Sequence, residues 1–462
     1  MLDAVLLWLE KNQKRHLEEL GQWLSIPSVS AQPEHAGDVR EAAGWAGDYL
    51  RGIGMQVEVI ETAGHPCVWA TTPEGLCEAG APQVLLYGHY DVQPAEPLDL
   101  WQTPAFKATV REGKIFARGA SDDKGQVHCH LAALRAWREI SGGLPCRVSV
   151  LLEGEEEVGS PNFMGVLKGR VAELAGVRTA LISDSNQFAP GVPAITYGLR
   201  GLVYFEIKLT AANSDLHSGM YGGAVPNPAN ILAKVLADLH DATGRVTIPG
   251  FYDDVLELTE EEKRMWAGLA FDEAGFMKEL GLQVLAGEEG YSTLARKWAR
   301  PTLDINGLTA GYQGAGAKTV LPGSASAKFS CRLVPNQKPG KIAKLVHEHI
   351  AKLVPAGIGC ELKEIGAGSP PALTPMESEA MGAAAEAMEI GFGKKPVFTR
   401  EGGSIPVVNW FKEVLGLDTV MVGFGLPNDH IHAPNEKLDL ECYFGGLKTA
   451  AALYGKLGEK LK

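Results

Sequence analysis

The sequence lacks cysteines arranged in pairs. Its seven cysteines are spread along the chain from Cys67 to Cys442, and none forms the close pair that zinc ribbons use. An odd number of scattered cysteines does not suggest a disulfide framework either. We therefore expect reduced thiols and a cytoplasmic location.

The sequence also has no excess of positive charge and no long hydrophobic run. The chain has 43 basic and 56 acidic residues and a formal net charge of -13. Because nucleic acids and anionic membranes bind basic surfaces, this balance argues against both as partners. No apolar stretch is long enough to span a bilayer, and no basic lead precedes the short N-terminal apolar run, so neither a membrane span nor a secretory signal is expected.

The first part of the chain alternates short apolar runs with helical patterns. A length of 462 residues favours two domains. Leucines at helical spacing predict that the chain opens with amphipathic helices. Further helices are predicted at 39–51 and 124–139, and buried strands at 83–87, 147–152 and 179–183. This alternation predicts an α/β layer with a largely parallel sheet.

After about residue 200 the pattern changes to a half-buried type. Val203, Phe205 and Ile207 alternate with polar residues, as in a strand with one face in water. The pattern then predicts helices at 227–241 and 341–353, strands at 327–333 and 360–365, a helical excursion at 259–299 and a linker at 366–375. We therefore expect an α/β domain formed by residues 1–200 and 373–462, with a central mostly parallel sheet, interrupted by an inserted α+β domain at 201–372.

Possible metal ligands follow the first predicted strand. His89 and Asp91 are two residues apart, so in an extended backbone they face the same side. His89 can then bind a metal while Asp91 fixes its other ring nitrogen. A histidine satisfied within a turn is the alternative.

Acidic residues occupy two further turns. Asp122 and Asp123 lie between a predicted strand and a helix, where adjacent acids are costly unless a cation is near; a helix N-cap is the alternative. Glu155, Glu156 and Glu157 follow an apolar strand and precede a Gly-Ser turn, and their alternative is a solvated face.

Two more motifs complete the set. Ser183-Asp184-Ser185 ends a predicted strand, and Asp429 to Glu436, with His430 and His432, follows a glycine-broken stretch. Each has a capping or turn alternative. Because α/β folds place ligands at the carboxyl ends of their strands, the motifs together predict a hydrolase with two metal ions, a bridging carboxylate and a base.

These motifs resemble the dinuclear zinc peptidase family of carnosine dipeptidases, carboxypeptidase G, aminoacylase and succinyl-diaminopimelate desuccinylase. The resemblance covers almost the whole chain. It is strongest to the branch of carnosine dipeptidase and cytosolic non-specific dipeptidase, through 215–223, 316–322 and 400–406. The inserted domain would then be a lid and dimerisation domain.

The resemblance implies a full set of metal ligands. Asp122 would bridge two divalent ions, zinc first with manganese or cobalt as alternatives, and the Asp122–Asp123 peptide bond would be cis. His89 and Asp184 would complete one metal site, and Glu157 and His432 the other. His430 is the rival of His432.

The resemblance also implies the catalytic and substrate-binding residues. Glu156 would be the general base, with Glu155 as an extra acid, and Asp91 would serve catalysis through its contact with His89. His217 would stabilise the oxyanion in the partner's active site, which implies a homodimer; an exposed histidine that caps a turn is its alternative. Arg332 would bind the free carboxylate of a dipeptide, an exposed strand arginine being the alternative. Further substrate contacts would come from Thr319, Gly403 and Ser404.

The expected function is therefore that of a metal-dependent dipeptidase. An N-acyl amino acid deacylase or a carboxypeptidase would share the metals and Glu156. A non-catalytic dimeric binding protein would be expected to have lost a ligand or the base, and none is missing. No Gly-x-Gly-x-x-Gly opens a helix after a strand, which argues against a nucleotide-binding protein.

Overall fold

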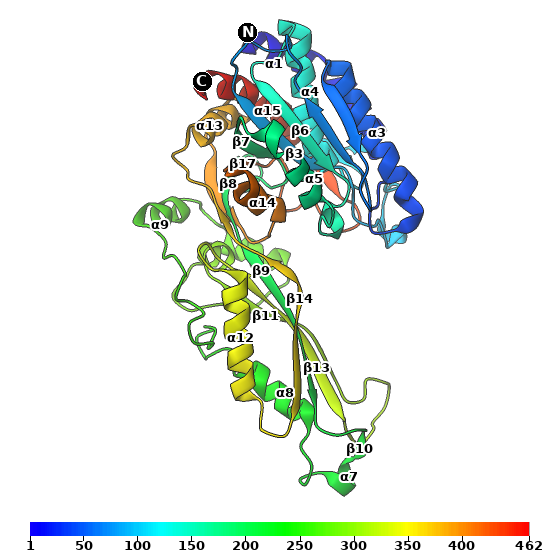
Figure 1. Ribbon diagram of the computed structural model, residues 1–462, viewed down its shortest axis with the longest axis vertical. Helices are drawn as coiled ribbons and strands as arrows, with labels where there is room; N and C mark the ends of the chain where they lie inside the picture. The colour runs from blue at the N-terminus through cyan, green and yellow to red at the C-terminus, as the bar shows by residue number, and fades with distance from the viewer. Residues whose placement is uncertain (462) are drawn as a thin grey trace. The chain divides into compact units, whose positions relative to one another are not determined.

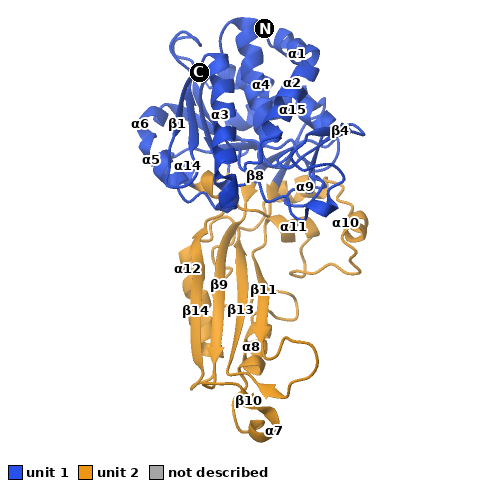
Figure 2. Ribbon diagram, turned by 90° about the vertical axis from the view of Figure 1, so that its right-hand side faces the viewer, with its two compact units in different colours: residues 1–197, 374–399, 410–462 blue, residues 198–373, 400–409 orange. Residues whose placement is uncertain are grey.

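The chain forms two compact units. The computed structural model describes residues 1–461. Unit 1 contains residues 1–197, 374–399 and 410–462, and unit 2 contains 198–373 and 400–409 (Figures 1 and 2). In the described part of the chain, no helix has both the length and the apolar character needed to cross a membrane.

The large sheet of unit 1 has a parallel centre. Its strands lie in the order β1-β2-β6-β3-β7-β17-β8, and the central strands β6, β3, β7 and β17 run parallel to one another. The outer pairs β1-β2, β2-β6 and β17-β8 are antiparallel. The strand bounds are β1 Gln56–Ile60, β2 Cys67–Thr71, β3 Gln83–His89, β6 Arg147–Glu153, β7 Val177–Ile182, β8 Ala194–Leu199 and β17 Thr419–Val422, with β16 (Val397–Glu401) also on β8. The predicted α/β fold with an inserted α+β unit is confirmed.

Helices cover both faces of this sheet. On one face α4 (Lys124–Ser141) lies so close to β3 that a Cβ on Gly88 would be 2.3 Å from Val127 Cγ2, which explains the glycine. On the other face Tyr87 contacts Phe163 of α5 (Phe163–Gly169) and Phe411 of α14 (Pro406–Leu415). The remaining helices of unit 1 are α1 Leu2–Lys11, α2 Gln13–Leu24, α3 Ala36–Ile53, α6 Val171–Leu174, α13 Glu379–Phe392 and α15 Leu440–Lys460.

Unit 2 has an antiparallel sheet in the order β11-β13-β9-β14. Along β9 buried residues alternate with partly exposed ones, as predicted, and Phe205 stacks on Phe329 of β13 inside the core of the unit. Helices α8 and α12 contribute Leu232 and Val346 to the same core. The bounds are β9 Gly201–Thr210, β11 Thr302–Ala310, β13 Ser324–Leu333, β14 Gly359–Ser369, α8 Pro228–Ala237 and α12 Pro339–Leu353.

The predicted linker at 366–375 contains the boundary at which the chain returns from unit 2 to unit 1, but most of it is strand. Strand β14 continues to Ser369, and β15 (Ala372–Leu373) follows it. Gly366 and Gly368 have φ of 75° and 71°, and the pairing of β14 with β9 shifts its register between Ile365 and Ser369. The glycines therefore form a bulge within a strand, where we had expected a loop.

The helical excursion is confirmed as three short helices, α9 (Glu260–Ala267), α10 (Glu273–Glu279) and α11 (Thr293–Trp298). Thr259 and Glu262 form a capping box at the start of α9. The short elements of unit 2 are β10 Leu216–His217, α7 Ser218–Tyr221 and β12 Val320–Leu321, and those of unit 1 are β4 Thr109–Arg111, β5 Lys114–Phe116 and β18 Lys437–Asp439.

Candidate metal centre

The side chains of the candidate centre gather at the carboxyl edge of the parallel strands. His89 is the last residue of β3, Glu156 and Glu157 lie shortly after β6, and Asp184 lies just beyond β7. Asp122 precedes α4. The Asp122–Asp123 peptide bond is cis, as expected. All these residues belong to unit 1.

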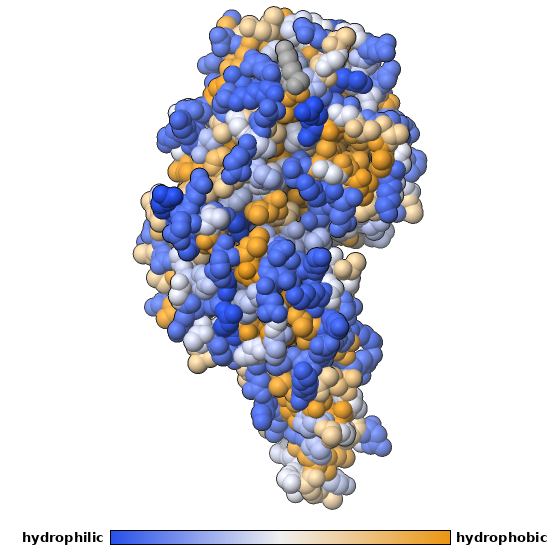
Figure 3. Space-filling model, turned by 60° about the vertical axis from the view of Figure 1, so that its left-hand side comes forward, coloured by the Kyte–Doolittle hydropathy of each residue, from blue (hydrophilic) through white to orange (hydrophobic). Residues whose placement is uncertain are grey.

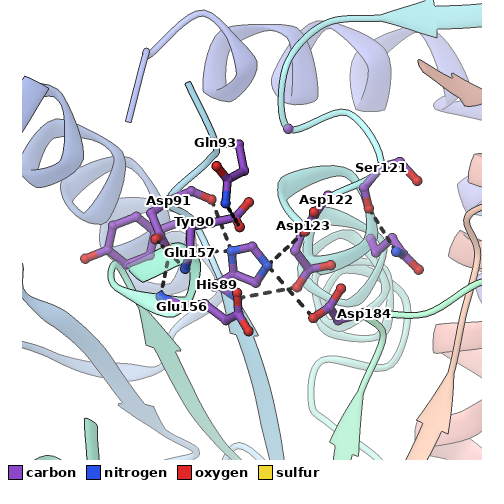
Figure 4. Close-up of polar contacts among 12 residues, drawn as sticks. His89, Tyr90, Asp91, Gln93, Ser121, Asp122, Asp123, Glu156, Glu157 and Asp184 are labelled. Atoms are coloured by element: carbon purple, nitrogen blue, oxygen red, sulfur yellow. Dashed lines mark hydrogen bonds and ion pairs between the residues drawn. The ribbon is translucent and has the colours of Figure 1, made fainter. Parts of the chain in front are cut away.

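The first group of possible ligands contains His89, Asp122 and Asp184. One ligand atom from each lies within 4.8 Å of the others. His89 Nε2 is 3.1 Å from Asp122 Oδ1 and 4.0 Å from Asp184 Oδ2 (Figure 4). His89 is fully buried. The three side chains can therefore hold one cation.

The second group contains Asp122, Glu157 and His432, again with ligand atoms within 4.8 Å of one another. His432 Nε2 is 2.9 Å from Asp122 Oδ2 and 3.4 Å from Glu157 Oε2. Each carboxylate oxygen of Asp122 thus lies beside a different histidine, which is the arrangement of a bridging ligand. His430 is exposed and belongs to neither group.

The backbone at His432 is strained. His432 has a φ of 62°, in the left-handed region that few residues other than glycine adopt. His430 and Asn435 also have positive φ, of 56° and 64°. Such conformations persist where the surrounding structure enforces them, often at functional sites.

The electrostatics of the centre favour a bound cation. Burial, together with the charge of Asp122, raises the pKa of Glu157 to about 10 and that of Asp184 to about 6. Burial acts in the same direction on Asp122, but hydrogen bonds to His432 and His89 outweigh it and hold the pKa of Asp122 below its usual value. A divalent cation would relieve the repulsion among these carboxylates.

Asp91 joins the histidine to the glutamates. Its carboxylate accepts the backbone N–H of Glu156 at 3.2 Å, the backbone N–H of Glu157 at 3.1 Å and the hydroxyl of Ser30 at 2.7 Å. His89 Nδ1 lies 3.1 Å from the Asp91 carbonyl oxygen and 3.4 Å from its carboxylate. Asp91 therefore contacts His89 as predicted and also places both glutamates.

Glu155 has a different environment from its two neighbours. Its carboxylate accepts hydrogen bonds from the backbone N–H of His65 and from Asn162. A Cβ on Gly64 would lie 1.8 Å from Glu155 Oε1, so a larger residue there would displace the Glu155 carboxylate. Glu155 therefore anchors the loop around residue 64 and is not among the grouped ligands.

The sequence interpretation missed two supports of the centre, Glu436 and Arg118. Glu436 is fully buried and accepts the backbone N–H groups of Gly119, Ser121 and Asp122 at 2.9, 2.9 and 3.1 Å. Arg118 Nη1 donates to Glu436 at 2.7 Å. In the sequence, Glu436 is one acidic residue in a predicted turn, and nothing near it indicates that it pairs with Arg118, 318 residues earlier.

The other predicted site residues lie in unit 2, in two groups. His217 is exposed, and its Nδ1 accepts the N–H of Gly219 at 3.0 Å, so it caps α7. Thr319 is its neighbour, because its carbonyl oxygen accepts the N–H of Ser218. In the other group, Arg332 Nη1 donates to Ser404 Oγ at 3.3 Å, and Gly403 is the exposed residue beside Ser404.

Comparisons with known proteins show relatives along nearly the whole chain. The model of peptidase family M20/M25/M40 matches residues 85–456. The chain is 34% identical to Cys-Gly metallodipeptidase DUG1 of Candida albicans, over 97% of this chain and 96% of that protein. It is 30% identical to the Beta-Ala-His dipeptidase of Rattus norvegicus, over 99% and 96%.

Solved structures are similar over the same extent. The M20 family metallo-carboxypeptidase Sso-CP2 from Sulfolobus solfataricus has a TM-score of 0.85 and 33% identity, over 96% of this chain and 99% of that one. The similarity therefore includes both units.

Proposed function

The chain belongs to peptidase family M20/M25/M40, and from this we propose that it is a metal-dependent dipeptidase acting on dipeptides with a free C-terminal carboxylate. The proposal is carried by Asp122, whose two carboxylate oxygens each lie beside a different histidine. Its support from relatives is a match over nearly the whole chain to proteins named as dipeptidases.

The residues present fit two divalent cations. Imidazole nitrogens and carboxylate oxygens are ligands that zinc accepts, and Asp122 belongs to both groups. We propose zinc as the metal, with manganese and cobalt as alternatives that the same donors suit. When bound, two such ions would polarise the scissile carbonyl and lower the pKa of the attacking water.

Glu156 is the proposed general base. It takes a proton from the attacking water and returns it to the nitrogen of the leaving amine. In the metal-free protein, burial raises the pKa of Glu156 to about 7, and bound cations would lower it toward the charged form that accepts a proton. Asp91 holds the backbone of Glu156 in place for both transfers.

Arg332 is the proposed binding residue for the substrate carboxylate. A guanidinium donates two parallel hydrogen bonds to a carboxylate, which suits a substrate that ends in one. Ser404, which accepts a hydrogen bond from Arg332, together with Gly403 and Thr319, completes the proposed substrate contacts.

We also propose a homodimer in which the partner subunit's His217 donates a hydrogen bond to the oxyanion. Because His217 Nδ1 accepts the N–H of Gly219, its neutral ring carries the proton on Nε2, and that N–H is available as a donor. The next residues offer apolar surface for a partner, with Met220 74% and Tyr221 41% exposed. Figure 3 shows orange and white side chains over this end of unit 2.

A cytoplasmic location is proposed from the cysteines. All seven are free thiols, five of them buried, and no pair forms a disulfide among the described residues. Free thiols are typical of a reducing compartment.

A carboxypeptidase is the second candidate, favoured by the 33% identity to Sso-CP2. Both activities need a free C-terminal carboxylate, and they differ in the length of peptide that is accepted. An N-acyl amino acid deacylase would instead require a blocked amine.

Hydrolysis of a substrate panel tests the proposal. The panel contains free dipeptides such as Cys-Gly, their N-acetylated and C-terminal amide forms, and a tetrapeptide. The protein is stripped of metal and reloaded with zinc or manganese. We expect metal-dependent cleavage of free dipeptides, lost in Glu156→Gln and kept in Glu139→Gln, an exposed glutamate on α4.

The other outcomes separate the candidates. Cleavage of N-acetylated substrates alone would move the protein to the deacylases. Release of a C-terminal residue from the tetrapeptide as fast as from a dipeptide would make it a carboxypeptidase. No cleavage by metal-loaded protein would contradict all three activities and favour a non-catalytic binding protein.

A further inference from the structure

Two arginines of unit 2, Arg200 and Arg332, are joined through one serine. The hydroxyl of Ser404 donates to the carbonyl oxygen of Arg200 at 2.5 Å and accepts from Arg332 Nη1 at 3.3 Å. The two positive charges are near enough that Arg332, after burial, helps to lower the pKa of Arg200 to about 10. A bound anion would offset the repulsion between the two charges.

Neither guanidinium has a carboxylate within 4.0 Å in residues 1–461, although both are partly buried. Other well-buried arginines of the chain are paired. Arg118 binds Glu436 at 2.7 Å and Arg135 binds Glu19 at 2.6 Å. Arg300 and Arg400 likewise each contact a glutamate.

The Arg200 side chain is held in place with donors to spare. Its Nε donates to the carbonyl oxygen of Gly402 at 3.2 Å, and the described residues take no hydrogen bond from its two Nη groups. A Cβ at position 402 would lie 2.9 Å from Arg200 Nη2, so the glycine makes room for the guanidinium. The guanidinium of Arg200 is therefore held in position through Nε, while its two Nη groups have no hydrogen-bond partner among the described residues.

The nearby acids do not neutralise this pair. Asp304 acts on both arginines electrostatically, and Glu401 acts on Arg200, but neither forms an ion pair with them. The carboxylate of Asp304 accepts the hydroxyl of Thr302, and that of Glu401 accepts the N–H of Gly402.

We propose that Arg200 is a second carboxylate-binding residue, and that its guanidinium and that of Arg332 hold the C-terminal carboxylate of the substrate together. This inference rests on the proposed function, because it names a residue of the same substrate site. Two charge-assisted contacts to one carboxylate would make the enzyme discriminate strongly against substrates with a neutral C-terminus.

The test compares Arg200→Met and Arg200→Lys with the wild type. Methionine keeps much of the side chain's volume without its charge, and lysine keeps the charge without the fork. The backbone contacts of residue 200 with Ser404 and Glu401 remain in both variants. Arg264→Met is the matched control, because Arg264 is an exposed arginine of unit 2 that only contacts its own helix.

Two ligands give the readout without any turnover. They are a dipeptide analogue in which CH2–NH replaces the peptide bond, with a C-terminal carboxylate, and the same analogue with a carboxamide. Their Kd values for metal-loaded protein are measured by calorimetry. In Arg200→Met we expect carboxylate binding to weaken roughly tenfold to a hundredfold and carboxamide binding to stay within about threefold. Arg200→Lys should lie between, and Arg264→Met should match the wild type.

Equal weakening for both ligands, or no change for either, would overturn the inference. If Arg200→Met does not fold, as judged by circular dichroism, Arg200→Lys decides in the same way, because loss of the fork alone must reduce the preference for the carboxylate. If the wild type prefers the carboxylate analogue but cleaves no dipeptide, the proposed activity is contradicted, while carboxylate binding by Arg200 and Arg332 is still supported by the loss of preference in Arg200→Met. If Arg200→Met hydrolyses dipeptides normally and keeps the wild-type preference for the carboxylate analogue, the proposed activity is supported and the role of Arg200 is contradicted.

Discussion

The carboxylate of Asp91 accepts the backbone N–H of Glu156 at 3.2 Å, so the residue that contacts the candidate ligand His89 also places the proposed base. Its other oxygen accepts the N–H of Glu157, which belongs to the second group of ligands. A single buried side chain thus connects the end of β3 to the turn after β6.

Asp91→Asn is expected to lower kcat and metal affinity together. The asparagine has the same shape, but its NH2 cannot accept an N–H, so one of the two backbone amides loses its partner. We expect a loss of roughly 10- to 100-fold in each quantity, as for other residues that support metal ligands. Steady-state kinetics and titration against a chelator give the two values.

Asp48→Asn is the control, because Asp48 is exposed on α3 and pairs only with Arg51. If Asp91→Asn lost activity with unchanged metal affinity, Asp91 would act on the base alone.

Glu436→Gln is expected to destabilise the protein and weaken metal binding. The amide group places a donor among Arg118 Nη1 and three backbone N–H groups that all need an acceptor. Breaking a buried pair of this kind costs about 3–5 kcal/mol. Denaturant unfolding of the metal-free protein measures the change in free energy.

Glu386→Gln removes a surface acid that pairs with Lys456 and Lys460. It should cost less than about 1 kcal/mol, as exposed pairs do. Similar costs for the two variants would show that Glu436 does not support the loop before α4.

The protein should lose stability as the pH falls from 6.5 to 4, in part through His16. Burial lowers the pKa of His16 to about 4, and neither ring nitrogen has a hydrogen-bond partner in the described residues. Between these pH values the unfolded chain binds a proton at His16 and the folded chain does not, so the free energy of unfolding falls with pH by about 3 kcal/mol at most from this group. Above pH 6.5 His16 has no such effect.

His16→Phe isolates this contribution. The free energies of unfolding of wild type and variant are compared at several pH values, and their difference should change in favour of the variant from pH 6.5 to 4. A constant difference for His16→Phe would show that His16 is protonated in the folded protein.

Gly88→Ala and Gly44→Ala are expected to have opposite effects. The methyl group at position 88 would lie 2.3 Å from Val127 Cγ2 and 3.0 Å from Asp123 Oδ2, so α4 would have to move. We expect a loss of about 1–3 kcal/mol and weaker metal binding. Gly44 lies in α3 with nothing within 4 Å of the added atom, and alanine there should stabilise by about 0.5–1 kcal/mol. Thermal unfolding and chelator titration measure both, and a neutral Gly88→Ala would contradict the close contact of α4 with β3.

That His89 and Asp184 lie together could be predicted from sequence because the strands before them, β3 and β7, are visible there, whereas Asp122 follows no strand of this sheet. Buried parallel strands appear as continuous apolar runs, and their carboxyl ends share one edge of the sheet. The assignment of catalytic and substrate-binding roles remains a prediction that rests on the family resemblance.

The supports of the centre could not be predicted in this way. Arg118 and Glu436 are 318 residues apart, and no local pattern pairs them. His430 and His432 both have positive φ, so which of them turns toward Asp122 depends on the enclosing loop. The glycines at 366 and 368 suit a loop and a bulged strand equally well, and only the pairing with β9 decides between them.

The position of β17 has a consequence for synthesis on the ribosome. β7 pairs with β17 only after the whole inserted unit has been made, so the nascent chain carries an open strand edge in the interim. The loop of His432 and Glu436 emerges later still, and it holds the last ligand and the support of the Asp122 turn. A chain that stops before residue 432 therefore lacks part of the candidate metal centre, which forms only after the inserted unit has been made.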